Sequence, residues 1–398
     1  MQSTKILPGL PLLSITCMLS FISLVGADAP HIDPAEDADH FGTPRNILFW
    51  TPEQQVAGYR NMDRIVPTRV IKAGNTVLPL PEAKIELGDV IIRLDDVAMS
   101  VDDYFQKQGV AGLLVIKDGK ILYERYGLGN NSASKWISFS IAKSVVSMLI
   151  GAAIQDGYIN SVDEKVSDYL PRLKGSSYDK SSIANLLQMA SGVQWNEDYA
   201  DPGSDINTAT WDTIGLYGYL RNKPRTAEPG EQFNYNTAET NLAGTLLRSA
   251  IGNNLATYLS DKIWRPFGME SDGSWNLTAP GDGEFGGCCI NATLRDYGRL
   301  GLFALSGGRL ADGTQVLTPG WMKESTTPSK DYSGYGYFWW LSNEDAFRAT
   351  GIFGQGIYIN RKENVVIALH SARPVASNEL DWVWQDRLYA AISDAVKD

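Results

Sequence analysis

The sequence predicts a mixed α/β (α+β) fold in which one antiparallel sheet is built from N-terminal and C-terminal segments. Strand-like runs lie near both ends of the chain, over residues 112–127 and again between 334 and 372. Residues from about 160 to 290 read as helices and loops, which predicts an inserted helical lobe. With 43% hydrophobic and 10% aromatic residues, the 398-residue chain can bury a sizeable core. We therefore expect helices to flank the sheet.

The first 27 residues have the pattern of a secretory signal peptide. Lys5 supplies the positive start, an apolar run follows, and small residues offer cleavage after Ala27 or Ala29. We expect removal of this segment, a periplasmic or secreted location, and no stable membrane association afterwards, with an uncleaved anchor as the alternative. Residues 28–100 are predicted to be an irregular N-terminal extension, and 101–398 to be the main domain.

Composition and charge exclude several functional classes. The formal net charge of −11 disfavours nucleic acid and anionic membranes as partners. Cys288 and Cys289 are neighbours, and adjacent cysteines rarely form a disulfide because the ring they close is strained. Two adjacent cysteines and three scattered histidines do not provide a metal-ligand spacing. We therefore expect no structural crosslink, no metal and no cofactor.

The elements of the main domain follow in order. Residues 101–110 read as a short helix, and 112–127 as a hairpin around Asp118-Gly119, a dipeptide typical of tight hairpin turns. Residues 140–155 are apolar on almost every face, which is typical of a buried helix. Further helices are expected at 181–193, 238–251, 254–269 and 292–305, strands at 334–341, 352–360 and 364–372, and a final amphipathic helix at 378–397.

A serine opens the predicted buried helix, and a lysine follows one turn later. The Ser-x-x-Lys pattern occurs at Ser132, Ser140 and Ser177, but only Ser140 begins a buried helix. Lys143 lies on the same helix face, and a desolvated lysine can lose its proton near neutral pH and act as a base toward a hydroxyl. The alternative is a capping serine beside a lysine whose amine reaches solvent.

Two further segments carry candidate site residues. Tyr235 lies in PGEQFNYNT before a helix, where it is either a core aromatic or a proton carrier between the Ser/Lys pair and a leaving group. Residues 351–360 carry glycines at 351, 354 and 356, which indicates close approach of a ligand or another backbone. This segment either supplies an amide N–H to an oxyanion hole or contains a β-bulge.

Together these segments resemble the serine β-lactamase and penicillin-recognising superfamily. The chain is similar to class C β-lactamases and their family VIII-type esterase relatives, and most of all to the aminohexanoate-dimer (nylon oligomer) hydrolases. The resemblance covers about residues 100–395 and is carried by FSIAKS, PGEQFNYNT, NLLQMASGV, GGCCINATLRDYGRLG and YGYFWWL. It implies that 101–398 is a β-lactamase-like catalytic domain that acts on a small molecule, as a monomer or homodimer.

The resemblance also implies a role for each matching residue. Ser140 would be the acylated nucleophile of a serine hydrolase, Lys143 its base, and Tyr235 the shared acid and base. The amides of Ser140 and Gln355 would bind the oxyanion, and Tyr199 in NEDYADP would donate a hydrogen bond to the leaving nitrogen. The remaining substrate-side candidates are Gly354, Phe353 and Trp339, with Trp195 and Trp340 as further aromatics that could line the pocket.

Two departures from the family pattern bear on the substrate. The family's asparagine two residues after the tyrosine is Thr237 here, with Asn236 as a candidate replacement, and its Lys-Thr-Gly is replaced by Ile-Phe-Gly at 352–354. Losing those contacts to a β-lactam carboxylate favours esters or linear amides. The alternatives are a true β-lactamase, a D-amino peptidase and a non-catalytic penicillin-recognising sensor. A Ser-His-Asp hydrolase would need a histidine, for which His370 is the candidate, and a Gly-x-Ser-x-Gly elbow. The sequence contains no such elbow.

Overall fold

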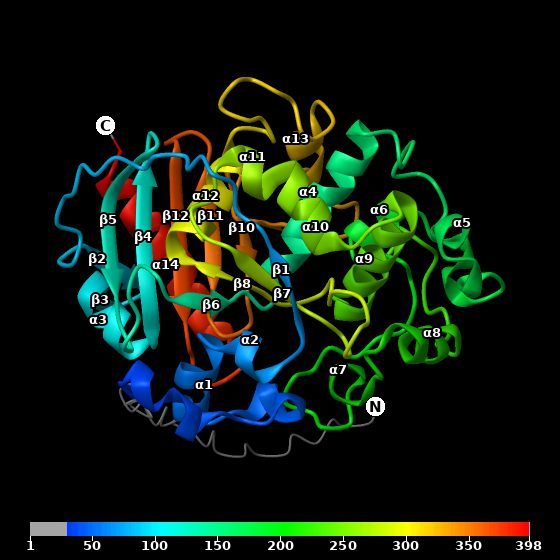
Figure 1. Cartoon of the computed structure of the whole chain (residues 1–398), viewed down its shortest axis with the longest axis horizontal. Coiled ribbons are helices and arrows are strands. Elements are labelled where there is room, and N and C mark those ends of the chain that lie inside the picture. The colour runs from blue at the N-terminus through cyan, green and yellow to red at the C-terminus, as the bar shows by residue number, and fades with distance from the viewer. Residues whose placement is uncertain (1–29, 398) are drawn as a thin grey trace, which may run out of the picture.

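The predicted antiparallel sheet is present, has six strands and occupies the left half of the molecule in Figure 1. The computed structural model describes residues 30–397, so the expected signal segment lies outside the described residues. The strands are arranged in the order β5-β4-β12-β11-β10-β9. Their bounds are β4 Val110–Lys117, β5 Lys120–Tyr126, β9 Trp340–Leu341, β10 Ala346–Thr350, β11 Gly356–Asn360 and β12 Val365–Ser371.

The hairpin between β4 and β5 turns at the predicted dipeptide. Asp118 and Gly119 have positive φ angles of 52° and 74°, the combination that a type I′ turn requires. On its other side β4 pairs with β12, where Val115 lies opposite Ile367. This pairing joins the N-terminal hairpin to the C-terminal strands, so the sheet combines both ends of the main domain.

Helices cover both faces of the sheet. On one face, α3 (Val101–Lys107) and α14 (Glu379–Ala395) contribute to an apolar core with β4, β11 and β12. On the other face, α12 (Leu294–Leu305) packs against β4, β11 and β12. A Cβ on Gly298 or Gly301 of α12 would come within 2.8 or 2.5 Å of strand side chains. These two glycines therefore allow the helix to approach the sheet closely.

The segment between the hairpin and the late strands forms the predicted helical lobe, which lies to the right of the sheet in Figure 1. Its central pair, α4 (Ile141–Gln155) and α9 (Thr237–Ile251), pack against each other. Residues 141–153 of α4 are all buried, as the apolar sequence predicts. The other helices of this half are α5 Val166–Tyr169, η3 Pro171–Leu173, η4 Ser177–Lys180, α6 Ile183–Leu187, α7 Asp205–Thr208, α8 Thr213–Arg221, α10 Leu255–Leu259, η5 Ser260–Trp264, α11 Arg265–Phe267 and α13 Trp321–Ser325.

A second, four-stranded sheet was not predicted. Its order is β1-β7-β8-β6, and its strands are β1 Thr68–Ile71, β6 Lys135–Ile137, β7 Gly273–Asn276 and β8 Ile290–Thr293. Each strand has only three or four residues, which is too short to show a clear alternation in the sequence. The sheet matters for function because β6 leads directly into Ser140.

The N-terminal extension is more regular than predicted. It contains η1 Pro34–His40, η2 Pro44–Phe49, α1 Pro52–Tyr59, α2 Met62–Ile65, β1 and the hairpin of β2 Ile91–Leu94 and β3 Val97–Ser100. Tyr59 is fully buried and contacts Phe139 and Phe353 at ring-centroid distances of 5.2 and 5.7 Å. A buried ion pair between Arg60 and Asp37, 2.6 Å apart, also fixes this segment. The extension is therefore ordered by packing against the segment that carries Ser140.

Two local expectations were wrong. The run 334–341 is mostly turn rather than strand, because Phe338 has a positive φ of 59° and only the last two residues pair as β9. The adjacent Cys288 and Cys289, expected to stay unpaired, are joined by a disulfide. Across residues 30–397, none of the helices combines the length and apolar character needed to cross a membrane.

Candidate active site

Ser140 lies at the start of α4, on a turn that the second sheet holds in place. Ser138 pairs with Ile290 of β8 through its N–H and through its hydroxyl, each at 2.8 Å. Phe139 then has a positive φ of 44°, a strained conformation for a residue with a large side chain. Ser140 occupies the N-cap position without making a side-chain capping bond. The capping alternative is therefore not realised, and the hydroxyl faces Lys143 instead.

Lys143 is enclosed and makes three polar contacts. Its Nζ lies 3.2 Å from Ser140 Oγ, 3.0 Å from Thr237 Oγ1 and 2.7 Å from the carbonyl oxygen of Gly287. The residue is only 1% exposed, so its amine does not reach solvent. Burial lowers the pKa of Lys143 to about 8, and the Glu197 carboxylate opposes that shift. A substantial fraction of this lysine is therefore neutral slightly above neutral pH.

Tyr235 completes the arrangement that the sequence predicted. Its ring lies 5.4 Å from Lys143 Nζ and stacks on Trp340 with centroids 5.5 Å apart. Burial and the nearby Glu197 carboxylate raise the pKa of Tyr235, while a hydrogen bond with the Ser140 side chain lowers it in part. The phenol is therefore protonated near neutral pH. Ser140, Lys143 and Tyr235 come together from α4 and from the segment before α9.

The sequence did not predict that Glu197 contacts this centre through Thr237. Glu197 accepts hydrogen bonds from the backbone N–H of Thr237 at 3.0 Å and from the Thr237 hydroxyl. Thr237 thus receives the lysine contact, whereas Asn236 points away, with its side-chain oxygen accepting from the N–H of Glu239 at 3.1 Å. Asn236 therefore does not replace the family's asparagine here. The only sequence signal for Glu197 was its position two residues before Tyr199.

The turn 351–355 approaches the nucleophile closely, as its glycines indicated. A Cβ on Gly351 would lie 2.4 Å from the carbonyl oxygen of Ser138, and Gly354 has a positive φ of 93°. The Gln355 side chain does not face a substrate, because its Nε2 donates to Ser371 O at 2.8 Å. Phe353 is fully buried in the core. Any oxyanion contact from this turn would therefore come from backbone N–H groups.

Two cavities meet at the candidate site, and Tyr199 and Ile352 line both of them. The larger, about 690 Å³, contains Ser140 and is lined mainly by apolar and uncharged side chains such as Phe285. The smaller, about 440 Å³, contains Tyr235. The charged residues that line them are Arg45 in the larger cavity, and Glu197, Asp198 and Arg348 in the smaller. The sequence reasoning had named neither arginine.

The remaining aromatic candidates differ in whether they line a cavity or pack in the core. Tyr199 lines both cavities, and its hydroxyl donates to Glu197 Oε1 at 2.7 Å. Trp339 does not face a cavity, because it is 1% exposed and packs edge-on against Phe347 in the core. Its neighbour Trp340 lines the smaller cavity instead. Trp195 is also buried.

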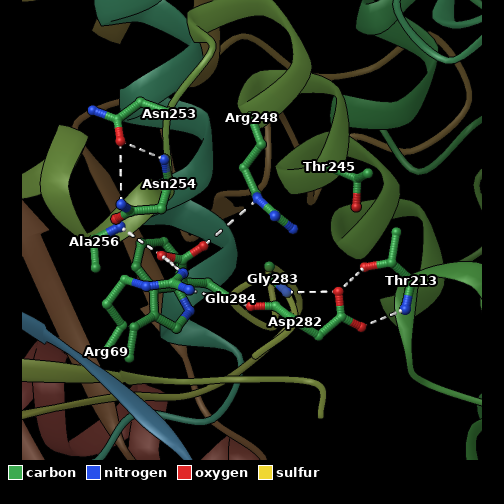
Figure 2. Close-up of polar contacts among 12 residues, drawn as sticks. Arg69, Thr213, Thr245, Arg248, Asn253, Asn254, Ala256, Asp282, Gly283 and Glu284 are labelled. Atoms are coloured by element: carbon green, nitrogen blue, oxygen red, sulfur yellow. Dashed lines mark hydrogen bonds and ion pairs between the residues drawn. The ribbon is translucent and has the colours of Figure 1, made fainter. Parts of the chain in front are cut away.

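A loop between β7 and β8 supplies the third contact of Lys143, and Figure 2 shows how this loop is anchored. Glu284, whose side chain is fully buried, pairs with Arg69 at 2.6 Å and accepts from the N–H of Ala256 at 3.1 Å. Asp282 accepts from the N–H and hydroxyl of Thr213, both at 2.7 Å. The same loop carries Gly287, whose carbonyl accepts from Lys143. These buried and partly buried polar contacts therefore hold one wall of the site.

The structure does not assemble the alternative triad around His370. This histidine is 1% exposed, lies 4.7 Å from the Tyr297 ring and 6.1 Å from Trp136, and lines neither cavity. Burial lowers its pKa to about 3. Ser177 lies outside the site, and its hydroxyl donates to Lys223 O at 2.8 Å. In the part of the chain that the structure describes, no three His, Cys, Asp or Glu residues are grouped to hold a metal ion.

Comparisons with known proteins identify the family of this chain. The beta-lactamase family model matches residues 100–390. The 6-aminohexanoate-dimer hydrolase of Paenarthrobacter ureafaciens is 25% identical over 342 residues, covering 79% of this chain and 84% of the relative. A beta-lactamase of Pseudomonas fluorescens is 27% identical over 183 residues, covering 43% of this chain and 48% of the relative.

Solved structures share the fold. A Bacillus anthracis protein provisionally named 6-aminohexanoate-dimer hydrolase superimposes with a TM-score of 0.77 at 24% identity, covering 86% of this chain and 94% of that one. A family VIII carboxylesterase gives a TM-score of 0.55 at 17% identity, covering 72% and 93%. The family match spans most of the chain. The chain therefore belongs to the beta-lactamase family of serine hydrolases.

Proposed function

We propose that the protein hydrolyses linear esters or amides through an acyl-enzyme on Ser140. One observation carries this proposal: a buried lysine, with a pKa lowered to about 8 by burial, lies 3.2 Å from the serine hydroxyl. A neutral amine at hydrogen-bonding distance can accept the serine proton as the oxygen attacks a carbonyl carbon. Without such a base the hydroxyl would be a weak nucleophile.

The proposed reaction proceeds in two halves. Ser140 Oγ bonds to the substrate carbonyl carbon while its proton passes to Lys143 Nζ, and backbone N–H groups of Ser140 and Gln355 bind the oxyanion. The tetrahedral intermediate then expels the leaving group. Tyr235 donates its phenolic proton to the leaving atom and regains a proton from Lys143. Water then attacks the carbonyl carbon of the acyl-enzyme and gives a proton to the same pair. The bond from that carbon to Ser140 Oγ breaks as the pair passes the proton to Oγ, which releases the acid and free Ser140.

The two cavities support a division of the substrate. Ser140 lies in the larger cavity, so the acyl chain would occupy that largely uncharged space. Tyr235 lies in the smaller cavity, so the leaving group would depart there beside Tyr199. A linear substrate could span both cavities past Tyr199 and Ile352, which line both of them. This favours esters and linear amides with an uncharged acyl part.

The relatives are consistent with this substrate class. The Paenarthrobacter ureafaciens relative is named a 6-aminohexanoate-dimer hydrolase. Tyr199 lines the smaller cavity, and its hydroxyl would have to turn from Glu197 to donate to a leaving nitrogen. True β-lactamase activity is the second candidate, since a Pseudomonas fluorescens relative carries that name. Residues 352–354, Ile-Phe-Gly, offer a β-lactam carboxylate no charged partner, which argues against that candidate.

Export is also part of the proposal. Lys5 and the following apolar run support a cleaved signal and a periplasmic or secreted enzyme. Expression of the full chain, fractionation of the cells and N-terminal sequencing of the product would test this. A new N-terminus near residue 28 or 30 in the exported fraction is expected. A full-length product confined to the membrane fraction would favour the anchor.

Covalent labelling tests the central proposal. A fluorophosphonate should form one adduct, which peptide mass spectrometry should locate on Ser140. Ser140→Ala should lose both labelling and turnover of p-nitrophenyl butyrate. Ser132→Ala and Ser177→Ala are matched controls, because each changes a serine of another Ser-x-x-Lys pattern outside the site, and both should keep full activity. Retained turnover in the Ser140 variant would refute the mechanism.

A further inference from the structure

Glu197 is a carboxylate at which several donors from around the site converge. It accepts hydrogen bonds from the N–H of Thr237 at 3.0 Å, the hydroxyl of Tyr199 at 2.7 Å, the Thr237 hydroxyl and the indole N–H of Trp195. It also lines the smaller cavity beside Tyr235. A carboxylate held by four donors has a fixed position and orientation.

Glu197 is connected to the base through one side chain. Lys143 Nζ donates to Thr237 Oγ1 at 3.0 Å, and that hydroxyl donates its own proton to Glu197 Oε1. An unbroken chain of hydrogen bonds therefore runs from Ser140 through Lys143 and Thr237 to Glu197. In nucleophilic enzymes generally, the base that activates a nucleophile is itself oriented by a third group.

We propose that Glu197 is the positioning residue for Lys143, acting through the Thr237 hydroxyl as the carboxylate of a triad acts on its base. This inference rests on the proposed function. Its consequence is electrostatic as well as geometric. When Lys143 takes the serine proton, it becomes a buried cation, and an uncompensated buried cation is costly. The Glu197 carboxylate supplies the compensating charge at the moment when the cation forms.

Among the described residues, Glu197 is the charged group that interacts with Lys143. The other titratable groups at the centre are Tyr235, Tyr199 and Tyr335, and burial raises the pKa of each phenol, so all three stay neutral. Burial lowers the pKa of Lys143, and Glu197 is the one charged residue that opposes this shift. Removing the Glu197 charge should therefore lower the pKa of Lys143 further.

A purely structural role predicts a different result. Glu197 also accepts from the first N–H of α9, where a carboxylate favours the helix N-terminus. If that were its whole purpose, replacing it would lower stability and the amount of active protein. The pH at which activity appears would not change. The pH profile thus separates the two roles.

The experiment measures kcat/KM for p-nitrophenyl butyrate against pH in Glu197→Gln, with active sites counted by fluorophosphonate labelling. The acid limb, the part of the profile where kcat/KM rises with pH, should move to lower pH. A lysine without its counter-charge loses its proton more readily. The plateau should fall roughly tenfold or more, because the base is weaker and less well oriented. Asp201→Asn is the matched control: it removes a carboxylate from an exposed position of the same loop and should leave the acid limb in place.

A second pair of variants tests the connection through Thr237. Thr237→Val removes the hydroxyl and should lower the plateau, whereas Thr237→Ser keeps a hydroxyl and should restore it to within about threefold. The pair also covers the case in which Glu197→Gln does not fold. The combined Glu197→Gln/Thr237→Val variant should lose little more than either single variant, because both changes break one chain of contacts.

The outcomes separate this inference from the proposed function. Labelling and turnover that depend on Ser140, together with an unmoved acid limb in Glu197→Gln, would overturn the role of Glu197 and leave the proposed function intact. An equal loss in Thr237→Ser and Thr237→Val would do the same. Failure of Ser140 to label in the wild-type enzyme would instead remove the proposed function itself.

Discussion

The amine nitrogen of Lys143 lies 3.2 Å from the hydroxyl oxygen of Ser140, one helical turn away along α4. The contact depends on two features of the local fold. The serine occupies the N-cap position without using its hydroxyl to cap the helix, and the lysine is buried rather than extended toward solvent. Burial destabilises the charged amine, so the helix carries a base beside a free hydroxyl.

The first prediction concerns pH. We expect kcat/KM for p-nitrophenyl butyrate to rise with pH through an apparent pKa near 8 and then to level off. The sign follows from the chemistry: the neutral amine accepts the serine proton, and burial lowers the pKa of Lys143 from 10.5 to about 8. Below that pKa the amine is protonated and cannot act as a base. The measurement is a pH series corrected for spontaneous ester hydrolysis.

Lys143→Arg provides the control for this profile. Arginine stays protonated at every accessible pH, so this variant should lose activity by roughly 10²-fold or more and show no rise near pH 8. A wild-type profile that is flat between pH 6 and 9 would contradict the assignment of Lys143 as the base.

The second prediction separates Tyr235 from His370. Tyr235→Phe should lower kcat/KM by roughly 10²-fold, the usual scale for losing a positioned proton donor. Combining it with Lys143→Ala should cost little more than the larger single effect, because the two residues work as a unit. His370→Gln should keep its kcat per labelled site, since the histidine is packed against Trp136 and Tyr297 away from both cavities.

His370→Gln is still expected to affect the protein through its stability. The ring is buried between aromatic neighbours, so the variant should melt at a lower temperature while each folded molecule remains active. If Tyr235→Phe were active and the histidine variant were not, a Ser-His-Asp mechanism would be favoured instead.

How much the sequence could predict depends on how local each feature is. The Ser140–Lys143 pair and the β4–β5 hairpin were predictable, because both follow from patterns within one helix or one turn. The Glu197–Thr237–Lys143 chain was not, because it joins residues 40 and 94 positions apart in sequence. Only the folded chain brings these residues together.

Even for two adjacent aromatic residues, the sequence does not predict which one lines a cavity. Trp339 and Trp340 are adjacent, yet one packs in the core and the other lines the smaller cavity. A regular strand would have revealed which faces inward, but the positive φ of 59° at Phe338 breaks the alternation just before them. The arginines of the cavities, Arg45 and Arg348, come from segments that no motif singled out.

The third prediction concerns the loop that carries Gly287. Glu284→Ala should lower the free energy of unfolding by about 1–3 kcal/mol, because it removes a fully buried carboxylate and leaves the buried N–H of Ala256 without its acceptor. Glu82→Ala is the matched control: its carboxylate, 51% exposed, pairs with Lys84 at 3.1 Å and with Arg295 at 3.6 Å, and the loss of these exposed contacts should cost less than about 1 kcal/mol. Urea unfolding of both variants measures the difference.

A functional effect should accompany the loss of stability. The Gly287 carbonyl accepts from Lys143 at 2.7 Å, so a loosened loop should slow fluorophosphonate labelling of Ser140 in folded Glu284→Ala. Labelling at the wild-type rate would show that the anchor at Glu284 does not reach the site.

The last prediction concerns substrate class. A β-lactam carries a carboxylate that loses water on binding, and leaving such a group unpaired costs several kcal/mol, with each 1.4 kcal/mol about tenfold in affinity. Residues 352–354 beside the nucleophile bring no charge to meet it. Arg348 lines the smaller cavity, but it is already paired with Asp386 at 3.1 Å. We therefore expect kcat/KM for p-nitrophenyl butyrate to exceed that for nitrocefin on the same preparation.

The preference for the ester over nitrocefin should change when the Arg348–Asp386 pair is broken. Asp386→Asn would free Arg348 to meet an anion, so nitrocefin turnover should rise relative to ester turnover. Asp394→Asn is the matched control on the same helix, because its carboxylate is exposed and pairs with Lys397 at 3.0 Å, and it should leave the ratio unchanged. Nitrocefin hydrolysed faster than the ester by the wild-type enzyme would mean that the β-lactam carboxylate has a partner other than the paired Arg348, with Arg45 of the larger cavity the first to test.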